Sequence, residues 1–148
     1  MTTNSSDGNY RHTQPGTLIR RVTLGIAVAL IAAGWFTGHL APMLVSGTML
    51  LIIAWLFHSL TIEITGGELI WFFGPGLIHK RVPLSDIVSA MPAKNGPSWG
   101  IHWSPRSGWL YNVSGFDAVL VTLRGEKKFM LGTDEPSALA EAIRSQVK

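Results

Sequence analysis

The chain has 148 residues, of which 47% are hydrophobic and only 14% are charged, whereas soluble domains usually carry about 25% charged residues. The formal net charge is +3, but residues 61–148 are nearly neutral and carry no basic stripe, which argues against nucleic acid as a partner. The absence of cysteine excludes disulfides, thiolate catalysis and cysteine-based zinc sites.

The first 17 residues are polar, with glycine and proline and almost no apolar side chains. Such a segment cannot bury enough apolar surface to offset the entropy lost on ordering. The composition therefore predicts that residues 1–17 form a disordered tail.

Residues 18–60 are apolar and contain two long uncharged runs, Val22–Phe36 and Met43–Leu60. A membrane span needs about 20 predominantly apolar residues, and the break at Thr37–Pro42 contains turn-forming glycine and proline. We therefore predict a transmembrane helical hairpin with helices at about 20–38 and 41–60. A cleavable signal peptide and a buried soluble helical hairpin are the alternatives.

Four side chains are expected to anchor this hairpin at the two membrane surfaces. Arg20 and Arg21 precede the first apolar run and can extend toward the headgroups, and Trp35 and Trp55 suit the interfacial aromatic belts. Small residues at Gly25, Ala29 and Ala33 lie four apart, and we predict that this stripe faces the second helix.

Basic residues flank the hairpin at both ends but are absent from its connection. Arg11, Arg20 and Arg21 lie before or at the start of the first helix, and Lys80 and Arg81 follow the second. By the positive-inside rule, the protein is expected to be a multi-pass protein of the cytoplasmic membrane with both termini in the cytoplasm.

Residues 61–148 show the alternating apolar pattern and the glycine-rich turns of short β-strands. Gly66-Gly67 and Gly74–Gly76 are expected to turn successive hairpins, and Pro92 is tolerated only near the end of its strand or in an edge strand. Roughly seven antiparallel strands are predicted, as a barrel or split barrel with Trp71 inside. A helix at about 134–147, with its apolar stripe on Leu139, Ala142, Ile143 and Val147, is expected to cap the barrel.

The segment from Gly108 to Ile143 contains a YNVSG corner, an apolar strand, a glycine hairpin and a GTDEP helix start. In this order of elements, behind a membrane hairpin, the chain resembles the bacterial pleckstrin-homology-like (PH-like) domain small membrane proteins. The resemblance implies an α+β membrane protein with a cytoplasmic PH-like domain at residues 61–148. It also implies a tethered interaction domain without a catalytic constellation.

No catalytic, cofactor or metal site is predicted. The histidines lack the spacing of a metal-binding helix, and there is no phosphate-binding loop sequence. Ser114, His102 and Asp117 are near one another in the sequence, but Ser114-Gly115 has the character of a turn. A membrane-bound hydrolase using Ser114 and His102 is therefore kept only as a remote alternative.

The candidate interaction surface is an aromatic turn formed by Trp99, Trp103, Arg106 and Trp109. It is either a packed hydrophobic corner or an exposed patch that contacts a partner or the bilayer. We expect a non-enzymatic protein whose domain binds a protein partner or organises a membrane complex. The alternative is binding of anionic lipid headgroups, with Arg106 adding attraction.

Overall fold

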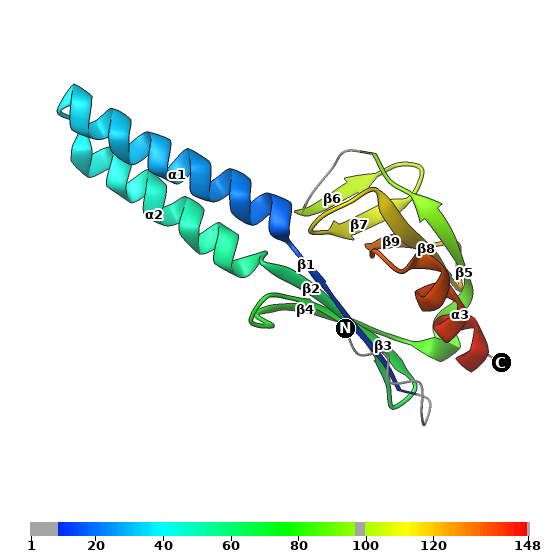
Figure 1. The fold of residues 1–148 in the computed structure, drawn as a ribbon. Helices are drawn as coiled ribbons and strands as arrows, with labels where there is room; N and C mark the ends of the chain where they lie inside the picture. Colours follow the sequence, from blue (N-terminus) through cyan, green and yellow to red (C-terminus); the bar gives the residue numbers. More distant parts are fainter. Residues whose placement is uncertain (1–8, 97–99, 148) are drawn as a thin grey trace.

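The computed structural model describes residues 9–96 and 100–147, and its fold is α+β. Two packed helices project from one end of a domain built from two β-sheets and a third helix (Figure 1). The helices are α1 (Thr17–Thr37), α2 (Leu40–Leu56) and α3 (Pro136–Gln146). The expected α+β architecture with an N-terminal helical hairpin and a C-terminal helix is confirmed.

The first sheet is antiparallel, with the strand order β1-β2-β3-β4. Its strands are β1 (Tyr10–Pro15), β2 (Ser59–Thr65), β3 (Glu68–Phe73) and β4 (Ile78–Pro83). The turn between β2 and β3 uses Gly66 and Gly67 at φ values of 59° and 78°, a conformation that glycine adopts at little cost. This hairpin is where the sequence predicts it.

The prediction of a disordered tail over residues 1–17 is wrong for Tyr10–Pro15, which forms the edge strand β1. The register runs from Tyr10 opposite Ile64 to Pro15 opposite Ser59. Strand β1 is ordered mainly by backbone pairing with β2, which composition does not reveal, and Tyr10 is its one aromatic side chain that packs against the core. It covers an edge of β2 that would otherwise be unpaired.

The second sheet has the order β5-β8-β9-β7-β6. Its strands are β5 (Ile87–Lys94), β6 (Gly100–Ser104), β7 (Gly108–Asn112), β8 (Asp117–Leu123) and β9 (Lys128–Gly132). A short 3-10 helix, η1 (Leu84–Asp86), connects the two sheets. Pro92 lies in β5, which is an edge strand, as its missing N–H requires.

The predicted barrel of roughly seven antiparallel strands is wrong in closure and in strand count. The described residues form nine strands in two open sheets, and β7 pairs with β9 in parallel. Strand β1 accounts for one additional strand. In the sheet, β9 lies between β7 and β8. It pairs with β8 in antiparallel orientation and with β7 in parallel orientation.

The core lies between the two sheets and beneath α3. Trp71 is buried as predicted, with its ring stacked on Phe129 at a centroid distance of 4.9 Å and edge-on to Tyr111 at 5.2 Å. Helix α3 buries Leu139 and Ile143 completely. Two residues of the predicted stripe are thus confirmed as buried, whereas Ala142 is only half-buried, Val147 lies just beyond the helix and Ala140 is buried in addition. The helix starts two residues later than expected, with Pro136 in its first turn.

Candidate functional site

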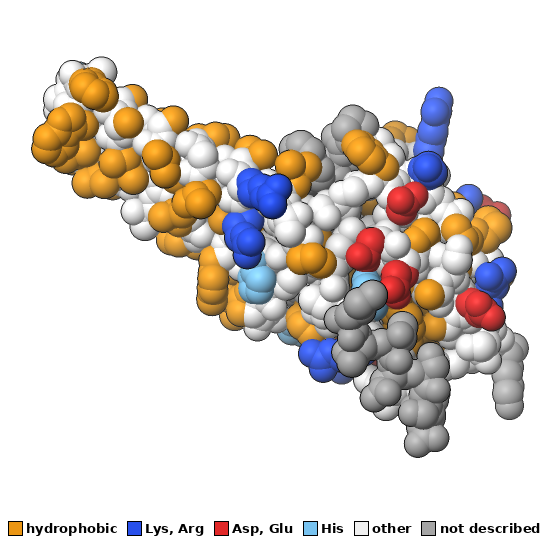
Figure 2. All heavy atoms as spheres, in the orientation of Figure 1, with side chains coloured by type: hydrophobic (Ala, Val, Ile, Leu, Met, Phe, Trp, Pro, Cys, Tyr) orange, Lys and Arg blue, Asp and Glu red, His pale blue; other side chains and the backbone are white. Residues whose placement is uncertain are grey.

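The hairpin of α1 and α2 has small side chains inside and large apolar side chains outside. Its buried residues are Thr23, Ala27, Gly34, Gly47 and Ala54. The hydrophobic side chains with the largest exposed fractions include Trp35 at 73%, Phe36 at 86% and Val45 at 70%. Figure 2 shows hydrophobic side chains along the projecting hairpin, with Lys and Arg side chains near its junction with the β-sheet domain. An apolar surface of this size indicates a non-aqueous environment or a partner.

The two helices approach most closely at glycine. A Cβ atom added at Gly34 would lie 2.8 Å from the Met43 Cβ atom, and one at Gly47 would lie 3.7 Å from the Ala27 carbonyl oxygen. Small residues let helix backbones come this near, and the packing that results is one driving force for association in membranes.

The predicted interface stripe is on the wrong face of α1. Gly25, Ala29 and Ala33 are exposed, and no atom lies within 4 Å of a Cβ atom added at Gly25. The helix has a second set of small residues, Ala27 and Gly34, and this set contacts α2 instead. Met43 and Gly47 of α2 lie against this second set, so Ala27 and Gly34 form the helix contact.

Among the described residues, only α1 is long and apolar enough to cross a membrane. It has 21 residues, and just 17% of its most apolar segment is buried inside the protein. Helix α2 is apolar throughout but has 17 residues. One candidate span near the N-terminus is therefore established by length and composition.

The four predicted anchoring residues lie at the two ends of the hairpin. Arg20 and Arg21 are exposed near the start of α1, and Trp55 is 56% exposed at the end of α2, so these three side chains share one end. Trp35 lies at the other end. The structure thus gives both ends of the hairpin an aromatic side chain and one end two cations.

The junction of the hairpin with the domain is held by backbone contacts. The Gly16 N–H donates to the His58 carbonyl oxygen at 2.7 Å, which joins the chain just before α1 to the chain just after α2. The turn after β3 lies against the same place, since a Cβ atom added at Gly74 would be 2.6 Å from the Leu56 carbonyl oxygen. We call this end of the domain the hairpin base.

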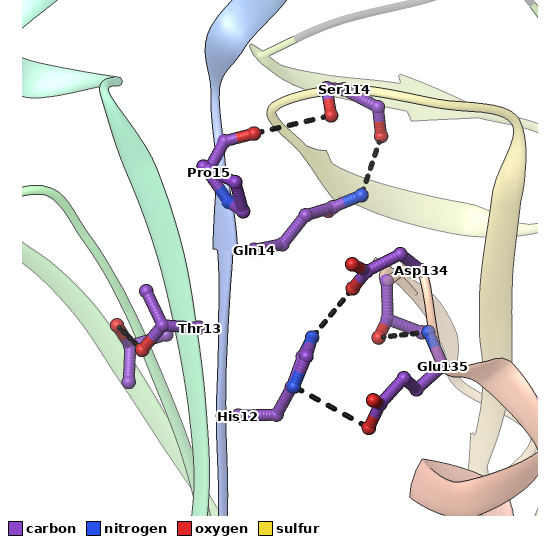
Figure 3. A network of polar contacts seen from close by, with 9 residues as sticks. His12, Thr13, Gln14, Pro15, Ser114, Asp134 and Glu135 are labelled. Carbon is purple, nitrogen blue, oxygen red and sulfur yellow. Dashed lines mark hydrogen bonds and ion pairs between the residues drawn. The ribbon is translucent and has the colours of Figure 1, made fainter. Parts of the chain in front are cut away.

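Strand β1 contacts the second sheet and the start of α3 as well as β2 (Figure 3). The His12 Nε2 atom lies 2.5 Å from the Asp134 Oδ1 atom, and its Nδ1 atom lies 3.5 Å from the Glu135 Oε2 atom. The Gln14 side-chain amide donates to the Ser114 carbonyl oxygen at 3.0 Å. The six residues of β1 therefore connect the hairpin to the first sheet, to the loop after β7 and to the start of α3.

Tyr10, at the N-terminal end of β1, is partly buried, and this burial changes the pKa of its hydroxyl. Desolvation raises the pKa of its hydroxyl, and the nearby carboxylates of Glu135 and Asp134 raise it further. Its hydroxyl oxygen is buried and has no hydrogen-bond partner in the described chain.

The aromatic turn is exposed where the structure describes it. Trp103 and Trp109 are directly opposite each other on β6 and β7, at 60% and 49% exposure, and Arg106 is exposed in the turn between them. Trp99 lies outside the described residues. The packed-corner alternative is therefore wrong for Trp103 and Trp109.

The turn and the hairpin base lie at opposite ends of the β6–β7 hairpin. Ser114, two residues beyond the end of β7, donates from its Oγ atom to the Pro15 carbonyl oxygen at 3.4 Å, next to the start of α1. The four residue steps from Asn112 back to Gly108 place the turn about 13 Å away along the strand. Arg106 is therefore not placed beside Arg20 and Arg21.

The structure does not bring the hydrolase residues together. The Ser114 hydroxyl contacts Pro15, and no hydrogen bond joins it to His102 in the described chain. Ser114 belongs to a turn in which its N–H donates to the Asn112 Oδ1 atom at 3.2 Å. No group of three or more His, Asp or Glu residues within 9–96 and 100–147 could hold a metal ion.

The fold and the hairpin define an α+β protein with one candidate membrane span. Neither a scan against models of known protein families nor a search of curated protein sequences gave a match for this chain.

Proposed function

We propose that the protein is an integral membrane protein whose α1–α2 hairpin crosses the membrane twice. The observation that carries this proposal is the six-residue pairing of β1 with β2. Because β1 leads directly into α1 and β2 follows α2 after two residues, the two ends of the hairpin must lie on the same side. A hairpin that enters along α1 then has to return along α2, although α2 is the shorter helix.

The domain side of the membrane is proposed to be the cytoplasm. Arg11, Arg20, Arg21, Lys80 and Arg81 all belong to the domain or to the hairpin base. The connection between the helices carries no Lys or Arg. This distribution supports cytoplasmic termini through the positive-inside rule.

The domain is proposed to act as a non-enzymatic, PH-like interaction module that binds a protein partner or organises a membrane complex. Its support is the resemblance over Gly108–Ile143 and the exposed pair Trp103 and Trp109. Tryptophan is enriched where proteins bind one another, and two adjacent indoles offer a large contact area with little side-chain entropy to lose.

Cysteine labelling tests the topology, because the chain contains no cysteine of its own. His39→Cys, between the helices, should react with a membrane-impermeant maleimide in intact cells, and Val88→Cys, in β5, should react only after permeabilisation. Labelling of Val88→Cys but not of His39→Cys in intact cells would overturn the cytoplasmic placement, and labelling of both positions from outside would overturn the double crossing as well. Protection of both in intact cells would overturn the double crossing.

A photo-cross-linking residue at Trp103 tests the interaction module in native membranes. We expect a discrete adduct that is absent when the same residue is placed at Val88, which is equally exposed at 60%. Identical cross-linking patterns from the two positions would contradict a specific role of the aromatic pair.

A further inference from the structure

The uncharged part of α1 is short for a membrane. From Val22 to Thr37 it has 16 residues, or about 24 Å of helix, whereas the hydrocarbon core of a bilayer is about 30 Å thick, so the 21-residue helix crosses only if Arg20 and Arg21 lie at the edge of that core. A span that is too short is accommodated by thinning of the bilayer and by flanking side chains that extend to the surface. Both responses bring the hairpin base toward the lipid headgroups.

Arg20 and Arg21 carry two positive charges at the hairpin base. Within the described part of the chain, neither guanidinium forms an ion pair. Residues 22–62 contain no acidic side chain at all. The two charges are therefore available to anions outside the protein.

Trp55 of α2 lies at the same level as these arginines. Ala27 packs opposite Gly47, and the helices run in opposite directions. Arg20 is seven residues before Ala27, and Trp55 is eight residues after Gly47, so each is about 11 Å from that contact. Tryptophan beside arginine is the arrangement found where a helix passes the headgroup region.

The domain adds an apolar side chain at the hairpin base. Gly74 is packed against the last turn of α2, and Leu77, three residues further in the same turn, is 69% exposed. Leu77 belongs to neither hydrophobic core cluster of the described chain, and its side chain is available to the membrane interface.

We infer that the hairpin base is a docking surface for anionic phospholipid headgroups, in which Arg20 and Arg21 bind the phosphates and Leu77 enters the interface. This inference rests on the proposed membrane insertion of the hairpin. It places lipid contact at the hairpin base and not at the turn around Arg106. The domain is thereby held against the membrane surface rather than suspended from it.

Single cysteines labelled with a polarity-sensitive dye test this inference in the full chain, reconstituted into nanodiscs of neutral or of anionic phospholipid. Leu77→Cys is the test position, Val88→Cys is the exposed control on β5, and Phe36→Cys reports insertion of the hairpin. We expect Leu77→Cys emission to shift to the blue in anionic discs relative to neutral discs, with no shift for Val88→Cys. Phe36→Cys should report an apolar environment in both.

The arginines are tested by combining Leu77→Cys with Arg20→Gln and Arg21→Gln. The difference between anionic and neutral discs should be lost in this variant and retained when lysine replaces both arginines. Water-like emission from Phe36→Cys would overturn the membrane insertion itself. With Phe36→Cys in lipid, a Leu77→Cys signal equal to that of Val88→Cys, or equal in both kinds of disc, would overturn the headgroup surface.

Discussion

The helical hairpin and the β-sheet domain place their large apolar side chains in opposite ways. In the domain, Phe73 is 1% exposed and Trp71 is 3% exposed, and the core is closed around them. In the hairpin, Phe36 is 86% exposed and Trp35 is 73% exposed, whereas the contact between the helices uses alanine and glycine.

This difference supports the proposed membrane insertion of the hairpin. In water, burying large apolar side chains is the main driving force, so they collect inside. In lipid, the surroundings are as apolar as leucine, and close packing of small residues holds helices together instead. The same residue type should therefore have different effects in the two regions when it is replaced.

Among the paired substitutions, Phe73→Ala and Phe36→Ala should differ most in their effect on the free energy of unfolding. Removing the buried ring of Phe73 leaves a cavity and is expected to lower the free energy of unfolding by about 3–5 kcal/mol. Phe36→Ala should change it by less than about 0.5 kcal/mol, since the ring packs on little within the protein. Urea titration of the full chain in detergent, followed by near-ultraviolet circular dichroism, measures both, and equal losses would contradict the comparison.

Val28→Lys and Val88→Lys compare two equally exposed valines, at 59% and 60%. If the hairpin is in lipid, a charge at Val28 near the middle of α1 costs about 2.5–3.5 kcal/mol, and membrane integration should fall on the order of a hundredfold. Val88→Lys should leave membrane integration unchanged. The fraction of protein resistant to carbonate extraction is the readout, and retention of Val28→Lys in the membrane would count against insertion of α1.

Gly34→Leu and Gly25→Leu test which small residues form the helix contact. At Gly34 the new side chain meets Met43 and the Leu40 backbone, and we expect a loss of about 1–3 kcal/mol. At Gly25 there is open space, and the free energy of unfolding should be maintained. Thermal unfolding in detergent distinguishes the two variants. A larger loss of stability for Gly25→Leu than for Gly34→Leu would mean that the predicted stripe of Gly25, Ala29 and Ala33 faces α2 after all.

Patterns local in the sequence predicted much of the fold. Two charge-free runs indicated the hairpin, the 3.6-residue period of Leu139 and Ile143 indicated α3, and Gly66-Gly67 marked a tight turn. Each of these signals is contained within a few residues, and the structure agrees with all of them.

The remaining features depend on partners distant in the sequence. Strand β1 is ordered by β2, which starts 44 residues after β1 ends. The sequence of Tyr10–Pro15 contains no pattern that predicts this pairing. Two sets of small residues on α1 fit a helix contact equally well, and only the position of Gly47 and Met43 decides between them. Local pattern also leaves open whether Trp103 and Trp109 are covered.

The smallest effect concerns Tyr10, whose strand joins the two regions. Its pKa is raised above the ordinary value of 10.0 because the hydroxyl is buried, with Glu135 and Asp134 nearby. The unfolded chain therefore loses this proton at a lower pH than the native protein does. The stabilising contribution is complete below pH 10 and decreases as the pH rises from there toward the raised pKa.

Tyr10→Phe removes this titration and keeps the ring. At pH 8 the variant should match the parent protein within about 0.5 kcal/mol, because the hydroxyl has no hydrogen-bond partner within the described residues. Above pH 10 the variant should become the more stable protein, by at most about 1 kcal/mol per pH unit, since Tyr10 is only partly buried and solvent screens its surroundings. Burial also raises the pKa of Tyr111, but Tyr111 is present in both proteins, so the difference between their unfolding curves from pH 8 to 11 isolates Tyr10. Parallel curves over that range would mean that β1 detaches before the rest of the domain unfolds, and the link between hairpin and domain would then be weaker than the six-residue pairing implies.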